Sequence, residues 1–563
     1  MRSLLSALII AIALCAPESA LAQLSSAPSE PTSASPAYGK FGMVSSAHPL
    51  ATEAGLDILK SGGNAFDAAV AIAATLNVVE PMMSGIGGYG TIMVYDAKRN
   101  EPWFLNCSGR IPSAVNSDAF RAPTPNYLAN RSGAKAVSTP GNVTCWKEMS
   151  RKYGRLKWNT LFTAAIGHAD NGFVLGERNA GAVRNAFPSF SEYAKRFYGK
   201  NGLPLGATDK LTQTDLAKTL RAISLDGSNY AASGTLAKAI DRSMKASDGF
   251  LSLNDLRRSR AEWWRPISID YRGHKIVTAS PPANSFDMLV RLGLMSRFDN
   301  KALGHNSVEY LHRFAEVTKI GFRVRLDHAS DPDIKSPSLD SLFSDKYWKQ
   351  ETDKIDLEKA RPFDRIEGGA SKQTHTTHFV VADKWGNVVS ATQTLGNLFG
   401  SRIMPEGTGV WLNNSLEYST FEPKGNPMDA FPGRHKLSGD CPTLVFHNRK
   451  LWAALGTPGG HTIGQTVPQM IMNLIDFRMD IQQAIAAPRI SFIEPDELGV
   501  ESAIAESTRN RLAAMGHKIA VFRNLGNAHG LTIEYDRNGK PILFRGGSDP
   551  RGEGVAIGVN HGK

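Results

Sequence analysis

Long hydrophobic runs are almost absent from this sequence of 563 residues. The one apolar stretch, residues 4–17, follows a Met-Arg start and precedes Ala20-Leu21-Ala22, an order typical of a secretory signal with an A-x-A-like cleavage site. It is too short for a membrane-spanning helix, which takes about 20 apolar residues. We therefore predict a signal peptide over residues 1–22, a flexible Ser- and Pro-rich leader over residues 23–39, and an exported protein, periplasmic or secreted, without a membrane partner after signal removal.

Cysteine is also scarce, with 4 residues in the whole chain. Cys15 lies in the predicted signal, which leaves Cys107, Cys145 and Cys441. Three cysteines cannot all pair, and so few in a chain of this length exclude a disulfide scaffold. The sequence allows one bridge and does not decide which two cysteines form it.

Blocks of basic charge are missing too, although the net charge is +11 and the pI is near 9.3. The lysines and arginines are spread along the chain without interleaved aromatic residues, which is typical of a solvated surface. We therefore predict no nucleic-acid partner. The 42% of hydrophobic residues indicates a globular protein with a large apolar core.

Two short motifs resemble ligand sites but stand in the wrong context. The stretch GIGGYG at residues 85–90 fits G-x-G-x-x-G, yet it follows a predicted helix and opens a predicted strand, the reverse of a dinucleotide fingerprint. We predict instead a turn at which the backbone approaches another segment closely. His375 and His378 stand three apart in a predicted strand, so their side chains point to opposite faces and cannot share one ion. The sequence predicts no cofactor and no metal site.

The pattern of apolar residues predicts interleaved helices and antiparallel strands. Helices are predicted at residues 48–60, 65–79, 466–476 and 508–515 and over most of 156–260 and 305–350. Hairpins are predicted at residues 91–95/103–106, 267–271/274–278, 378–382/388–394, 443–446/451–455 and 532–535/541–544. This alternation indicates a layered α/β sandwich with helices on both outer faces.

The junction near residue 375 carries the most specific chemistry. A Gly- and Ser-bearing segment, GGASKQ at residues 368–373, runs into the predicted strand that contains Thr376. A threonine hydroxyl becomes an effective nucleophile when its own α-amine, with an ordinary pKa near 8, acts as the base. That arrangement requires a cut before the threonine, for which a flexible segment entering a strand is suited. The structural alternative is a strand that begins with threonine, a common strand residue.

The sequence resembles the γ-glutamyltranspeptidase family of N-terminal nucleophile hydrolases. Eight motifs carry the resemblance, in family order: 46–55 (SAHPLATEAG), 62–70 (GGNAFDAAV), 84–88 (SGIGG), 139–141 (TPG), 376–378 (TTH), 412–414 (LNN), 458–460 (PGG) and 548–551 (SDPR). The resemblance implies a four-layer αββα sandwich. It also implies cleavage between His375 and Thr376 into a large subunit, residues 40–375, and a small subunit, residues 376–563.

The resemblance further implies catalytic roles for four residues. Thr376 matches the nucleophile of both processing and turnover, and Thr394 matches the threonine that hydrogen-bonds it. The backbone N–H groups of Gly459 and Gly460 match the oxyanion hole, where glycine permits close approach to a tetrahedral intermediate.

The carboxylate side of the expected substrate pocket departs from the family pattern. Ser438 matches a serine of the carboxylate site, but Ser108 stands where the family has arginine. Arg110 follows two residues later, on the same face of a strand, and its guanidinium could clamp a carboxylate instead.

The amine side departs further. Gly396 replaces an expected asparagine, with Asn397 next to it, and Ser415 and Tyr418 replace an amide or acid and an aspartate. An ammonium without a carboxylate partner binds poorly, because its desolvation is not offset. Glu417 neighbours this gap, but a strand would direct its side chain elsewhere.

The leading hypothesis is a self-processing amidohydrolase that cleaves γ-glutamyl amides such as glutathione, a small-molecule amide or peptide, by hydrolysis or transpeptidation. The first alternative is an acylase for carboxylate-bearing acyl groups without an α-amine, such as glutaryl, oxamate-like or β-lactam side chains. The second is a periplasmic binding protein of the same fold without catalysis.

Overall fold

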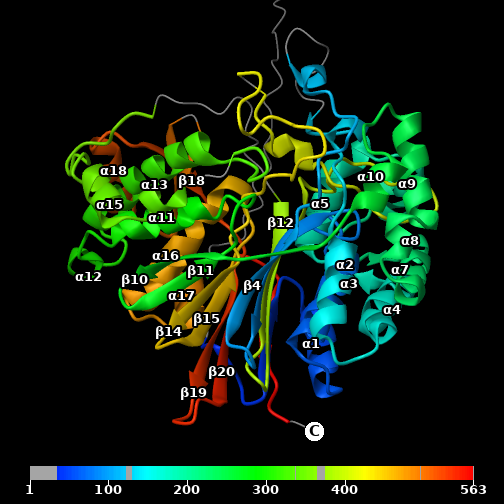
Figure 1. Ribbon diagram of the computed structural model, residues 1–563, viewed down its shortest axis with the longest axis horizontal. Helices are drawn as coiled ribbons and strands as arrows, with labels where there is room; N and C mark the ends of the chain where they lie inside the picture. Colours follow the sequence, from blue (N-terminus) through cyan, green and yellow to red (C-terminus); the bar gives the residue numbers. More distant parts are fainter. Residues whose placement is uncertain are drawn as a thin grey trace, which may run out of the picture. The chain divides into compact units, whose positions relative to one another are not determined.

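Two seven-stranded sheets form the centre of the structure, a computed structural model (Figure 1). It describes residues 35–121, 130–335, 338–363, 375–421, 423–494 and 496–561. The predicted signal peptide, most of the predicted leader and the segment 368–374 lie outside the described residues. The described residues all belong to one compact unit.

The two sheets are antiparallel throughout. In order across the first sheet, the strands are β1 (Ala37–Gly39), β20 (Pro541–Ser548), β19 (His529–Tyr535), β15 (Lys450–Gly456), β14 (Thr443–His447), β11 (His274–Thr278) and β10 (Ile267–Tyr271). Across the second they are β21 (Val555–Gly558), β2 (Gly42–Ser46), β12 (His375–Asp383), β13 (Val388–Gly396), β3 (Tyr89–Asp96), β4 (Glu101–Cys107) and β9 (Glu262–Trp264). All five predicted hairpins are confirmed.

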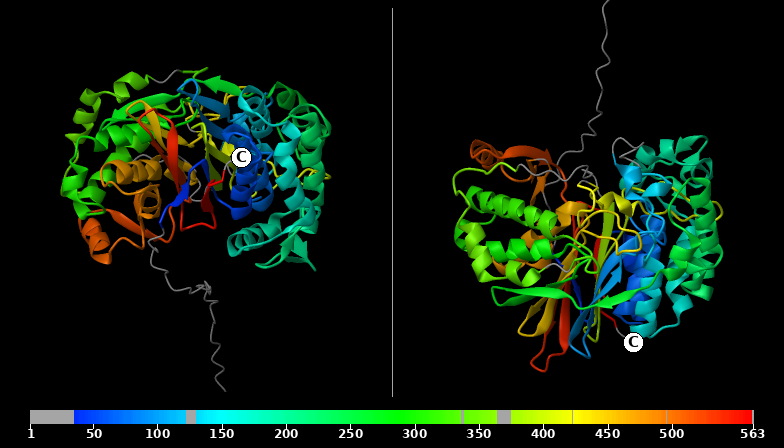
Figure 2. Two further views of the ribbon diagram at one scale, coloured as in Figure 1. Left: turned by 90° about the horizontal axis from the view of Figure 1, so that it is seen from below. Right: turned by 45° about the horizontal axis from the view of Figure 1, so that its top comes forward.

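Helices cover the outer face of each sheet, as Figures 1 and 2 show. Against the sheet that contains β12 lie α1 (Pro49–Lys60), α2 (Ala65–Val79) and α3 (Asn142–Tyr153), while α4 (Thr163–Asn171) packs on α2 and α7 (Thr214–Asp226) packs on α4. Against the other lie α11 (Phe286–Met295), α16 (Ile463–Ile475) and α17 (Ile481–Ala486), while α13 (Val308–His328) packs on α11. The two central sheets with helices on both outer faces (Figure 1) confirm the predicted αββα sandwich.

Smaller elements surround these layers. They are α5 (Glu177–Ala186), α6 (Glu192–Tyr198), α8 (Asn229–Ala232), α9 (Thr235–Ala246), α10 (Leu253–Arg258), α12 (Asn300–Leu303), α14 (Leu339–Leu342), α15 (Asp345–Thr352), α18 (Glu506–Ala514), and a three-stranded sheet of β16 (Ile490–Ile493), β17 (Glu497–Glu501) and β18 (Lys518–Phe522). Within the described ranges, no helix combines the length and the apolar character that a membrane crossing requires.

The side chains of β12 alternate between its two faces and enter two of the apolar cores of the sandwich. Val380 packs into the core between the two sheets, whereas Phe379 and Val381 pack under helices α1 and α2. Alternate residues of a strand face opposite sides, so one apolar strand supplies both cores. A strand buried on both faces holds its side chains in fixed positions, and β12 carries Thr376 near its first residue.

The first residues of the described chain differ from the prediction of a flexible leader through residue 39. Ala37–Gly39 form β1, which pairs with β20 in register Ala37 to Gly546. Backbone hydrogen bonding to an existing edge strand requires little of the side chains, so the polar composition gave no signal of it.

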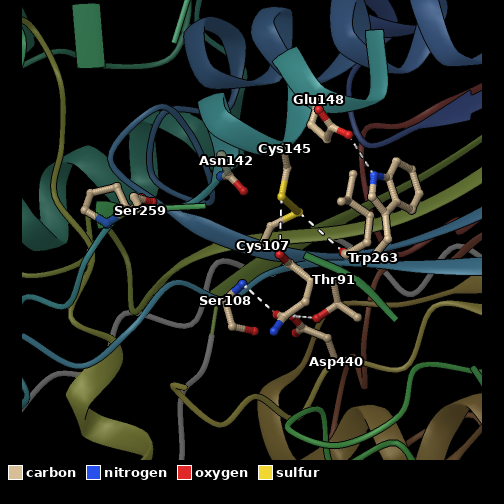
Figure 3. The surroundings of a disulfide bond; sticks show 12 residues. Thr91, Cys107, Ser108, Asn142, Cys145, Glu148, Ser259, Trp263 and Asp440 are labelled. Carbon is tan, nitrogen blue, oxygen red and sulfur yellow. Dashed lines mark hydrogen bonds between the residues drawn. A yellow bond between two sulfur atoms is a disulfide. The ribbon is translucent and has the colours of Figure 1, made fainter. Parts of the chain in front are cut away.

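A disulfide joins Cys107, at the end of β4, to Cys145 in α3 (Figure 3). Both cysteines are buried, and Cys441 is a buried free thiol. The bridge thus fastens the strand that leads into Ser108 and Arg110 to a helix of the outer layer.

Replacement of both Cys107 and Cys145 by serine should lower the free energy of unfolding by about 2–4 kcal/mol, because the bridge closes a loop with a sequence separation of 38 residues. Urea unfolding with and without reductant measures this. Reductant should destabilise the wild type and leave the double variant unchanged. Equal stability of the wild type with and without reductant would contradict the assignment of a disulfide between Cys107 and Cys145.

Candidate active site

Thr376 lies buried near the start of β12, directly opposite Thr394 of β13. The pairing of the two strands shifts register between His375 and Thr376. Such irregularities often redirect a side chain beside an active site. The peptide bond predicted to be cut therefore lies where a regular strand begins.

One hydroxyl connects the predicted nucleophile with the predicted scissile bond. Thr376 donates a hydrogen bond from Oγ1 to Thr394 Oγ1 at 3.2 Å, and Thr394 Oγ1 donates to the carbonyl oxygen of His375 at 2.7 Å. The backbone N–H of Gly396 donates to the same Thr394 oxygen at 2.7 Å. Thr394 Oγ1 is thus placed between the predicted nucleophile and the carbonyl oxygen of the predicted scissile bond.

Replacement of Thr394 by valine, which keeps the shape and removes the hydroxyl, should slow self-cleavage on the order of 100-fold, the usual cost of one lost oxyanion donor. The time course of chain cleavage on denaturing gels measures this. Thr394→Ser is the matched control and should cleave nearly as fast as the wild type. A valine variant that matches the wild type would remove Thr394 from the mechanism.

The predicted oxyanion loop lies in the same cavity as Thr376. The cavity has a volume of ≈440 Å³, and its wall includes Thr376, Pro458 and Gly459. Gly459 has φ 141° and Gly460 φ 56°, conformations that favour glycine. Gly460 begins a 3₁₀ turn that leads directly into α16, so the loop carries the positive end of a helix dipole.

Charged side chains that the sequence analysis did not single out also line this cavity. They are Glu177 and Arg178 of α5, and Arg551 of the SDPR motif. Arg178 pairs with buried Glu80 at 3.3 Å, and Arg551 pairs with Glu501. Arg551 lies in one of the eight motifs that carry the family resemblance, whereas no motif includes Glu177 or Arg178.

The glycine motif at residues 85–90 makes the predicted close backbone approach. A Cβ on Gly88 would lie 2.4 Å from the carbonyl oxygen of Thr394, and one on Gly87 would lie 2.1 Å from that of Trp411. Both contacts are shorter than side chains tolerate, so glycine is required for β3 to lie beside the end of β13.

Arg110 lies away from Thr376 among acidic groups. It lines a separate cavity of ≈100 Å³, and among the described residues the wall of the Thr376 cavity does not include it. Its guanidinium donates to Glu262 Oε1 at 2.9 Å and to the carbonyl oxygen of Gly433 at 3.1 Å. Carboxylate binding by Arg110 stays a prediction.

The other predicted substrate residues gather around the ends of β3 and β13. Ser438 Oγ lies 3.3 Å from Thr91 Oγ1 of β3, and the next residue, Gly439, packs on Gly460. Asn397 lines a cavity of ≈280 Å³ whose wall, like that of the Thr376 cavity, includes His375. Figure 3 places Ser108 near Thr91 and Asp440.

Ser415 and Tyr418 lie in a short 3₁₀ helix, Ser415–Tyr418, and not in a strand. Ser415 is buried, and the Tyr418 ring lies 5.6 Å from that of His461, beside the oxyanion loop. This corrects the expectation for Glu417, which was predicted to point away. The tight turn directs Glu417 inward, where Oε2 accepts a hydrogen bond from Asn397 Nδ2 at 2.6 Å.

The family model described as gamma-glutamyltranspeptidase matches residues 51–559 of this sequence. This chain belongs to the γ-glutamyltranspeptidase family. The match confirms the resemblance on which the site residues were assigned. It makes the chain an enzyme of the N-terminal nucleophile type, a hydrolase or transferase.

Three proteins similar to this chain each match most of its length. A glutathione hydrolase proenzyme of Bacillus subtilis (strain 168) is 34% identical over 545 residues, 93% of this chain and 92% of the relative. An acylase ACY 1 proenzyme of Pseudomonas sp. (strain V22) is 34% identical over 497 residues, 86% and 88% of the two chains. The crystal structure of cephalosporin acylase from Bacillus halodurans has a TM-score of 0.86 at 27% identity and covers 96% of this chain and 99% of its own.

Proposed function

We propose that this chain is an exported, self-processing amidohydrolase that cleaves γ-glutamyl amides such as glutathione. The observation that carries the proposal is the hydrogen-bonded series from Thr376 Oγ1 through Thr394 Oγ1 to the His375 carbonyl oxygen. A binding protein without catalysis has no need of this arrangement. The word proenzyme in the names of both curated relatives supports processing.

Processing begins with attack of Thr376 Oγ on the carbonyl carbon of His375. The peptide C–N bond breaks, the nitrogen takes up the hydroxyl proton, and an ester joins the two subunits. Water hydrolyses this ester, which leaves a carboxylate on His375 and a free α-amine on Thr376. The products are a large subunit that ends at His375 and a small subunit that begins at Thr376, both within one αββα unit.

Turnover uses the same oxygen with the new terminus as its base. The α-amine takes the proton of Thr376 Oγ as this oxygen attacks the substrate amide, and gives it to the leaving amine. The N–H groups of Gly459 and Gly460 stabilise the oxyanion, and the resulting acyl ester passes its acyl group to water or to an acceptor amine. None of these steps uses a cofactor.

The acylase relative favours a second candidate function, hydrolysis of amides whose acyl group has a carboxylate but no α-amine. Glutathione and a glutaryl amide, assayed side by side with the processed enzyme, decide between the two. Preferential cleavage of glutathione supports the proposal. Preferential cleavage of the glutaryl amide would replace it with the acylase function.

A further inference from the structure

One buried cation beside the active site has no hydrogen-bond acceptor among the described residues. Lys436 is 2% exposed, and its Nζ lies 3.5 Å from the ring centroid of Tyr89 and 4.5 Å from that of Tyr418. The two rings attract the charge but do not satisfy three N–H donors. A buried ammonium without an acceptor is costly, which indicates that an oxygen from outside the chain completes this site.

Lys436 lies between the two parts of the reaction centre. Tyr89 of β3 pairs directly with Thr394 of β13, the partner of the nucleophile. The ring of Tyr418 contacts His461, which follows the two glycines of the oxyanion loop. An anion bound to Lys436 would therefore lie beside two aromatic rings that adjoin Thr394 and the oxyanion loop.

Glu417 provides an opposite charge in the same cluster. Its Oε2 accepts from Asn397, whereas its buried Oε1 has no donor among the described residues. The missing side chain at Gly396 makes room for this oxygen, because a Cβ there would lie 3.0 Å from Glu417 Oε1. Burial raises the pKa of Glu417 to about 8, although the charge of Lys436 opposes this shift. Burial lowers the pKa of Lys436 to about 7, although the charges of Asp440 and Glu417 oppose it.

We propose that Lys436 binds the α-carboxylate and Glu417 the α-ammonium of the acyl group, which makes the chain specific for acyl groups with a free amino-acid end. The inference rests on the proposed function, and it assigns to Lys436 the carboxylate contact that the sequence predicted for Arg110, which lines a separate cavity. Asp440, which accepts from Thr91, adds a second carboxylate to the cluster. A glutaryl group would add a negative charge to a cluster that already has two carboxylates and one ammonium. The zwitterionic end of a γ-glutamyl group adds no net charge.

Inhibition of the processed wild type by three small acids tests both contacts without any substitution. L-Glutamate has both charged groups, glutarate lacks the α-ammonium, and 4-aminobutyrate lacks the α-carboxylate. We expect L-glutamate to inhibit at least ~30-fold more strongly than either analogue, since each loses one partner of a buried charged contact. Glutarate that inhibits as strongly as L-glutamate would overturn the role of Glu417, and 4-aminobutyrate that does so would overturn that of Lys436.

Variants assign the contacts to the two side chains. Glu417→Gln should lower kcat/KM for a γ-glutamyl anilide by ~30-fold or more and leave that for the glutaryl anilide within about threefold. Lys436→Met should lower kcat/KM for both anilides. Lys450→Met, which removes a lysine over the ring of Tyr535, is the matched control and should lower neither. Self-cleavage of each variant reports that it has folded.

The anilide assays distinguish a failure of this inference from a failure of the proposed function. Cleavage of the γ-glutamyl anilide by the wild type with an unchanged preference in both variants would overturn the inference alone. A processed wild type that cleaves neither anilide would overturn the proposed function and the inference together.

Discussion

Thr376→Ala should remain a single uncut chain and lose amidase activity by a factor on the order of 10⁶, the usual effect of removing a catalytic nucleophile. Alanine removes the oxygen that donates to Thr394 Oγ1 and changes little else, because the side chain is already buried among strands. Both losses should occur together, since one oxygen serves processing and turnover. Release of an anilide product and denaturing gels measure them.

Thr376→Ser is the matched control for this prediction. Serine retains the hydroxyl and loses only a methyl group, so it should still be cut and should retain measurable activity. Cleavage of the alanine variant at the wild-type rate would show that another residue attacks the chain. An uncut alanine variant with wild-type activity would show that Thr376 is not the nucleophile of turnover.

Asp549→Ala should lower the free energy of unfolding by about 3–5 kcal/mol, because it leaves a buried guanidinium without its counter-ion. Asp549 Oδ2 accepts from Arg489 at 2.7 Å, and both side chains are fully buried. Its Oδ1 accepts from Arg551 at 2.9 Å, and Arg551 lines the Thr376 cavity. The substitution should therefore also reduce activity. Thermal or urea unfolding measures the loss of stability.

The matched control is Asp353→Ala, which breaks an exposed pair with Lys349 and should change the free energy of unfolding by no more than ~0.5 kcal/mol. Burial alone would raise the pKa of Asp549, but the charges of Arg489 and Arg551 outweigh it and lower this pKa to about 2. Since the pKa of this carboxyl in the unfolded chain is near 3.9, the contribution of Asp549 to the free energy of unfolding is complete above pH ~4. This contribution is lost as the pH falls toward 2. A variant as stable as the control would contradict this account.

The elements of the sandwich could be predicted because their patterns are local. β10 and β11 were predicted at Ile267–Tyr271 and His274–Thr278, where apolar alternation flanks an Arg-Gly turn. The helix α2, Ala65–Val79, was predicted from its closely spaced apolar residues, and every residue in it is buried. The position of the nucleophile followed from the resemblance rather than from such patterns.

The buried charged cluster of Glu417 and Lys436 could not be predicted in the same way. The direction of Glu417 depends on a 3₁₀ turn that no apolar pattern marks, and on the space that Gly396 leaves in another element. Lys436 gave no signal, because burial of a lysine between two tyrosines from distant segments depends on the tertiary arrangement. The pairing of Cys107 with Cys145 was likewise open until β4 and α3 were placed.

The most direct test of the central claim is the intact mass of the purified wild-type protein under denaturing conditions. The account predicts two chains, the smaller of which has the mass of residues 376–563 and begins with the free α-amine of Thr376. A single uncut chain after long incubation, or a small chain that begins at another residue, would contradict it.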